Sequence, residues 1–183
     1  SILKEPLYKL SGTLFIQVLA IERPVFRFLA IMTTNKTLGK FETEIEIKNA
    51  VKFLNALATK IHSLPDCLEL VHAVDLHEGD WHESGAIKCW TYTTLEGETE
   101  SALERQEIDE QNKVLTINFL KGQIMDVCKR YKLTLSCISH IKSPILRLTI
   151  DYELITPGYP LLEKYVPMLV KCFKEIDAHI ADW

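Results

Sequence analysis

Residues 75–92 read D-L-H-E-G-D-W-H-E-S-G-A-I-K-C-W-T-Y. A nine-residue polar loop, residues 77–85, separates two alternating stretches, so the pattern predicts a strand, a loop and a second strand. In the second strand Lys88, Trp90 and Tyr92 share one face, because side chains alternate along a strand. Two amphipathic aromatic side chains beside a lysine are unusual for a packed core face. We therefore predict that this strand forms one wall of a ligand pocket.

The bulk properties restrict the class of protein. The chain has 183 residues, 47% of them hydrophobic, which suits one domain. A net charge of −4 gives no electrostatic basis for binding nucleic acid or an anionic membrane. No apolar run approaches the roughly 20 residues of a membrane span. Five cysteines, without CxxC or zinc spacing, predict free thiols in a reducing compartment and hence a cytoplasmic protein.

The hydrophobic periodicity predicts an α+β fold. Asn49 can cap a helix over residues 50–58, and a second short helix over residues 60–64 ends before Pro65. Helical spacing continues from Pro160 to residue 180, with Pro167 inside the helix. Period-two alternation predicts seven antiparallel strands, at residues 38–47, 67–77, 86–92, 99–108, 114–120, 124–137 and 145–153.

The pattern D-L-H-E-G-D-W…G-x-I-K-x-W-x-Y resembles the plant major latex proteins, a branch of the birch-pollen-allergen and pathogenesis-related superfamily. Further matches are M-T-T-N-K-T-L-G-K-F from Met32, E-R-x-E at residues 104–107 and K-E-I-D-A-H at residues 174–179. The chain departs from the family at C-K-R-Y, residues 128–131, and at Y-E-L, residues 152–154, where the family has Y-K-x-F and Y-E-K.

This resemblance implies a START-like helix-grip fold over residues 32–183, with residues 1–31 as an extension outside the core. In that fold a curved seven-stranded sheet grips the C-terminal helix around a large hollow, and two short helices close one end. The implied ligand is a small hydrophobic plant metabolite (lipid, steroid, flavonoid or alkaloid-like), carried by a monomer without a cofactor. The implied biological setting is defence or stress response.

The facing of the strand at residues 67–77 is open. Counting hydrophobicity favours an inward face of Leu68, Leu70, His72, Val74 and Leu76. The family's phase turns the other face inward, and we adopt that phase because it places Asp75 near Lys88. Taken together, the expected ligand-binding residues are Phe53, Leu57, Asp75, Lys88, Trp90, Tyr92, Leu115, Ile117, Phe119, Tyr131, Leu133, Leu135, Tyr165, Leu169 and Cys172.

Two other functions stay open. A cofactor-independent cyclase, isomerase or condensing enzyme would use Lys88 as base or carbonyl-activating group, with Asp75 and Tyr92 as partners. An adaptor would bind another protein through residues 1–31. We expect no metal site in the loop at residues 77–83, because its His, Asp and Glu residues lack ligand spacing. The glutamates between residues 96 and 110 read as solvated turns and edges.

Overall fold

A computed structural model of the chain describes residues 37–139 and 144–180, and also four short strands near the N-terminus. These strands pair as β1 with β4 and β2 with β3. The rest of residues 1–31 lies outside the described residues, so their separation from the core fold stays a prediction. The four strands are β1 Leu3–Lys4, β2 Tyr8–Leu10, β3 Leu14–Ile16 and β4 Leu19–Ala20.

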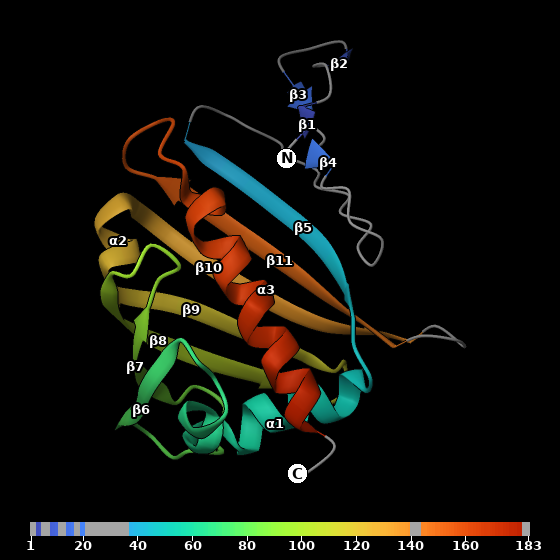
Figure 1. Cartoon of the computed structure of the whole chain (residues 1–183), viewed down its shortest axis with the longest axis vertical. Helices are drawn as coiled ribbons and strands as arrows, with labels where there is room; N and C mark the ends of the chain where they lie inside the picture. The colour runs from blue at the N-terminus through green and yellow to red at the C-terminus, as the bar shows by residue number, and fades with distance from the viewer. Residues whose placement is uncertain are drawn as a thin grey trace.

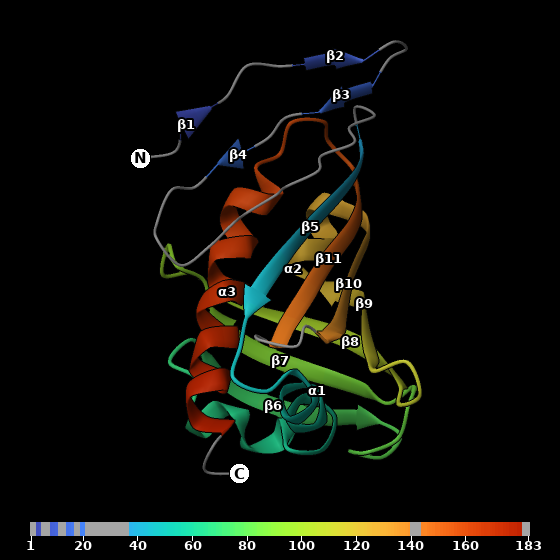
Figure 2. The ribbon, with the colours of Figure 1, turned by 90° about the vertical axis from the view of Figure 1, so that its right-hand side faces the viewer.

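A single antiparallel sheet of seven strands dominates the described chain and curves around the long helix α3 (Figures 1 and 2). The strand order is β5-β11-β10-β9-β8-β7-β6, so β5 and β6 are the two edges. The predicted α+β class and helix-grip arrangement are confirmed. The strands are β5 Leu38–Glu46, β6 Val71–Glu78, β7 Ile87–Thr93, β8 Thr99–Asp109, β9 Val114–Gly122, β10 Cys128–Ser139 and β11 Pro144–Leu154.

Two short helices follow β5, as predicted. Helix α1, Ala50–Thr59, begins where the Asn49 side chain accepts a hydrogen bond from the backbone N–H of Lys52 at 2.9 Å. The second is the 3₁₀ helix η1, Ile61–Asp66, which continues through Pro65 rather than ending before it. The predicted strand at residues 67–77 consequently begins later, at Val71.

Helix α3, Leu161–His179, packs its buried face against the sheet and α1. Phe173 meets Phe53 of α1 edge to face, with ring centroids 5.6 Å apart. Pro167 lies inside this helix. No helix in the described part of the chain is long and apolar enough to cross a membrane.

The strand predicted at residues 124–137 is wrong at its start. Residues Gln123–Val127 form the one-turn helix α2, and β10 begins only at Cys128. The cause is Gly122, whose φ of 114° turns the chain out of the sheet. The side chain of Gln123 then accepts a hydrogen bond from the backbone N–H of Ser101 at 2.9 Å, which fixes the turn against β8.

Candidate functional site

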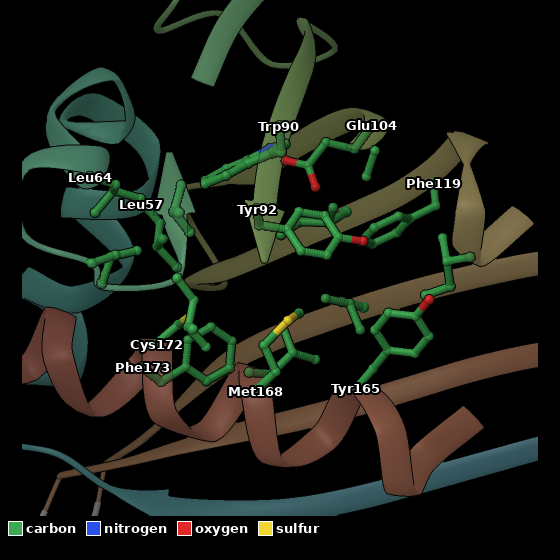
Figure 3. A pocket seen from close by; sticks show the side chains of 18 of the residues that line it. Leu57, Leu64, Trp90, Tyr92, Glu104, Phe119, Tyr165, Met168, Cys172 and Phe173 are labelled. Carbon is green, nitrogen blue, oxygen red and sulfur yellow. The ribbon is translucent and has the colours of Figure 1, made fainter. Parts of the chain in front are cut away.

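A cavity of about 110 Å³ lies between α3 and the inner face of the sheet (Figure 3). Its wall is mostly apolar, and its polar side chains are Glu104 and Gln106 of β8 together with the polar ends of Trp90 and three tyrosines. Eleven of its lining residues were predicted from the sequence, namely Leu57, Trp90, Tyr92, Ile117, Phe119, Tyr131, Leu133, Leu135, Tyr165, Leu169 and Cys172. The others are Leu64, Leu68, Leu70, Val71, Ala102, Glu104, Gln106, Ile124, Met168, Phe173 and Ile176.

The cavity is smaller than the large hollow that the resemblance implies. Large side chains project into it from both sides, and Figure 3 shows Met168 and Phe173 of α3 opposite Tyr92 of β7. Phe119 and Tyr131 pack edge to face at 5.0 Å and occupy the side toward β9 and β10. Two further predicted residues, Phe53 and Leu115, are buried in the core but do not line the cavity.

The prediction that Asp75 faces the cavity is wrong. Asp75 is exposed and pairs with Cys89, so it shares the face opposite Trp90. A register irregularity at His72, between Val71 and Ala73, is the physical reason. It switches the phase of β6 part-way along, so that neither of the two alternations considered from the sequence holds over the whole strand.

Lys88 is fully buried on the inner face of the sheet, where it pairs with Glu104 across β7 and β8, but it does not line the cavity. Its Nζ donates to Oε1 of Gln106 at 2.6 Å, and Nε2 of Gln106 donates to Oε1 of Glu104 at 3.1 Å. Burial lowers the pKa of Lys88, while the Glu104 carboxylate opposes that shift. The glutamine amide therefore links a buried cation to a buried acid.

Glu104 brings a carboxyl group into the cavity wall. Burial raises its pKa to about 7, against the opposing effects of Trp90, Gln106 and Lys88. Figure 3 shows its carboxyl group beside the indole nitrogen of Trp90. That nitrogen, Nε1, is buried and has no hydrogen-bond partner in good geometry within the described part of the protein. One carboxyl oxygen of Glu104 and the indole N–H thus meet at the same end of the cavity.

A second polar cluster fastens α3 to the sheet. Oε2 of the buried Glu100 accepts hydrogen bonds from the hydroxyl groups of Tyr92, at 3.1 Å, and Tyr165, at 2.9 Å. Oε1 of Glu100 pairs with Nζ of Lys164 at 2.7 Å. Burial, followed by the Glu100 carboxylate, raises the pKa values of both tyrosines, so their hydroxyls stay protonated donors. The cluster therefore ties β7 and β8 to the first turns of α3.

Tyr131 differs from the other two tyrosines of the wall. It is 2% exposed, and its hydroxyl has no hydrogen-bond partner among the described residues. Burial raises its pKa well above the ordinary value, so the hydroxyl stays protonated. A buried, unpaired hydroxyl in a cavity wall is costly unless something occupies the cavity and pairs with it.

The prediction that the glutamates between residues 96 and 110 are solvated is wrong for two of these glutamates, Glu100 and Glu104, which are buried. Glu100, Glu104 and Gln106 form the inward row of β8, while Ser101, Leu103 and Arg105 face outward. Both faces of this strand carry charge, so hydrophobic counting could not separate them. The signal that could have done so is the hairpin register, because a turn at residues 95–97 pairs Tyr92 with Glu100 and Lys88 with Glu104.

The raised pKa of Glu104 predicts a pH dependence of stability. A group whose pKa rises from 4.5 unfolded to about 7 folded contributes stability below the lower value, and this is lost as pH rises through the upper one. We expect the unfolding free energy of Glu104→Gln, relative to wild type, to rise by about 3 kcal/mol between pH 4.5 and 8. Urea titrations across that range measure it, and parallel pH profiles would refute the assignment.

Among the described residues, no group of three or more His, Cys, Asp and Glu side chains could hold a metal ion. All five cysteines are free. Burial raises the pKa of Cys172, which lines the cavity, to about 12, so this thiol is a poor nucleophile.

Comparison with known proteins decides the family. The sequence profile described as the pathogenesis-related protein Bet v 1 family matches residues 36–182. The chain belongs to this family. Within it, the chain is 32% identical over 149 residues to the MLP-like protein 329 of Arabidopsis thaliana, covering 79% of this chain and 97% of that protein. MLP-like protein 328 of the same plant is 31% identical with the same coverage, which places the chain in the major latex protein branch.

The solved structures agree with the Bet v 1 fold. The crystal structure of ginseng major latex-like protein 151, from Panax ginseng, superimposes with a TM-score of 0.72 at 24% identity, covering 78% of this chain and 97% of that one. The solution structure of an Arabidopsis thaliana member of the major latex protein family has a TM-score of 0.57 at 31% identity, with coverage of 80% and 96%. Proteins of the Bet v 1 family bind hydrophobic ligands.

Proposed function

We propose that this protein binds a small hydrophobic ligand in the cavity between α3 and the sheet. The observation that carries the proposal is an almost wholly apolar space lined by α3 and the inner face of the sheet. Membership of the Bet v 1 family supports the same function.

The size of the cavity limits the ligand. A cavity of about 150 Å³ in an engineered lysozyme binds benzene, so about 110 Å³ suits a single ring unless the wall moves. Burying about 280 Å² of such a ligand contributes about 7 kcal/mol, and association costs at least about 4 kcal/mol. Apolar contact alone therefore gives millimolar binding, and a tighter ligand needs polar contacts or a wider cavity.

A larger groove of about 310 Å³ lies outside, between α1 and the β8–β9 turn. Its lining includes Lys52, Asp109, Glu110 and Lys113, which keep it wet. An apolar ligand gains less there, because water stays in contact with both surfaces. We therefore assign ligand binding to the internal cavity.

The biological setting follows from the branch of the family. We propose that the ligand is a plant metabolite and that the protein acts in defence or stress response in the cytoplasm, where five free cysteines stay reduced. In this proposal residues 32–183 form the ligand-binding unit, and residues 1–31 take no part in binding.

A catalytic function is less well supported. The proposed base Lys88 does not line the cavity, and its proposed partner Asp75 is on the opposite face of the sheet. Only Tyr92 of the three reaches the cavity, and its hydroxyl already donates to Glu100. These three residues therefore cannot act together on a bound molecule.

The proposal can be tested with a substitution that fills the cavity with a larger side chain. Ala102 is 1% exposed and lines the cavity, so Ala102→Leu should weaken toluene binding at least about fivefold, because overpacking costs about 1–3 kcal/mol. Isothermal calorimetry measures the affinity. The matched control is Ala73→Leu, at a half-buried position that pairs with Thr91 on the outer face of the same sheet, and should bind toluene as wild type does. Equal affinity in a folded Ala102→Leu variant would place the ligand elsewhere.

A further inference from the structure

One end of the cavity holds polar atoms whose hydrogen-bonding capacity the protein leaves partly unused. Nε1 of Trp90 is a buried donor without a complete hydrogen bond, and the carboxyl of Glu104 beside it has acceptor capacity beyond the single bond from Gln106. Both residues line the cavity. An unpaired buried donor next to an acceptor with free lone pairs is unfavourable in an empty cavity and favourable around a ligand that pairs with both.

The chemical class follows from what can pair with both groups at once. A hydroxyl group has one donor and two acceptor lone pairs, so it can donate to Glu104 and accept from the indole N–H of Trp90. A methyl group pairs with neither. An indole-type N–H could donate to Glu104 but could not accept from Trp90.

Charge argues for a neutral ligand. The fully buried Lys88 already compensates the Glu104 carboxylate through Gln106, so a cationic ligand would bring a second positive charge into a dry site. The cavity size and the rings of Phe119, Tyr131 and Phe173 in its wall favour an aromatic body. The unpaired hydroxyl of Tyr131, elsewhere in the wall, is available to a second polar atom of a larger ligand.

We propose that Glu104 and Trp90 form a hydroxyl-binding end of the cavity, and that its ligands are neutral aromatic molecules bearing a hydroxyl group. This inference rests on the proposed ligand-binding function and makes it specific. Gln106 and Lys88 act as positioning residues. Gln106 donates a hydrogen bond to the carboxyl of Glu104, and Lys88, which does not line the cavity, donates to Gln106 in turn.

The test compares phenol with toluene, which have the same shape and differ by a hydroxyl in place of a methyl group. Calorimetry gives both dissociation constants for the wild type and for Glu104→Leu. We expect the ratio of the toluene constant to the phenol constant to fall about tenfold or more in Glu104→Leu, because a hydrogen bond to a charged group is lost. Toluene binding should change little, which controls for altered cavity shape.

Proton linkage supplies a second readout that does not depend on the folding of Glu104→Leu. A hydroxyl that donates to Glu104 stabilises the carboxylate, so phenol binding to the wild type should release protons at pH 7 and tighten from pH 6 to pH 8. The other groups facing Glu104 are Lys88 and Tyr92 of β7, and burial raises the pKa of Tyr92 far above this window. The isosteric variant Glu104→Gln should lose the proton release, which assigns it to Glu104 rather than Lys88.

The outcomes separate the two levels of the proposal. An unchanged ratio together with phenol binding that releases no protons would overturn the hydroxyl site and leave the ligand-binding function standing. Failure of both phenol and toluene to bind the wild type would overturn the ligand-binding function as well.

Discussion

Replacing Gly122 by alanine should destabilise the protein by at least about 3 kcal/mol. Gly122 has φ 114° and ψ 175°, a region that residues with a side chain scarcely enter. A Cβ atom built there lies 2.0 Å from the backbone carbonyl oxygen of Ser101. Backbone atoms of a paired strand cannot move aside cheaply, so the junction of β9, α2 and β8 would have to open.

The matched control is Gly97→Ala. Gly97 also has a positive φ, +88°, but a Cβ atom there meets nothing within 4 Å. This variant should lose only about 1 kcal/mol, the conformational cost without the clash. Urea unfolding measures both free energies. Equal losses at the two glycines would show that the contact with Ser101 is not what makes Gly122 necessary.

Replacing Gln106 by leucine should cost about 3 kcal/mol, since it removes the acceptor of the buried Lys88 ammonium and the hydrogen bond that Gln106 donates to Glu104. The double variant Lys88→Met/Gln106→Leu removes the stranded cation, and we expect it to recover at least about 1.5 kcal/mol. A double-mutant cycle by urea unfolding gives this coupling. Additive losses would mean that the two side chains do not depend on each other.

The sequence was sufficient for the architecture wherever one face of an element was clearly apolar. Alternation in β5 and β11 and the helical spacing of α3 predicted those elements within a few residues. Hydrophobic periodicity does not predict where a strand ends when the chain is turned by an unusual backbone conformation. The positive φ of Gly122 converts an apparently continuous strand into α2 and β10, and alternation alone does not reveal it.

The candidate site was predictable only on its apolar side. Trp90, Tyr92 and Tyr165 face the cavity as expected, because aromatic side chains at regular spacing mark an inward face. Asp75 was misplaced because one extra residue at a bulge reverses every later side chain of a strand. Glu104 was missed because a buried acid is recognisable only from its neighbours. Its neighbours Lys88, Gln106 and Trp90 come from two strands, so recognising it requires the register that the turn at residues 95–97 sets and not the alternation along β8 alone.

Ligand binding between α3 and the sheet is tested most directly by NMR, following methyl resonances of the wild-type protein as toluene is added. Binding in the internal cavity predicts shifts of Ile117, Leu133 and Met168, which line it, while Val51 and Val114 of the outer groove stay unchanged. Shifts confined to Val51 and Val114, or no shifts at toluene saturation, would contradict the claim that this protein carries its ligand between α3 and the sheet.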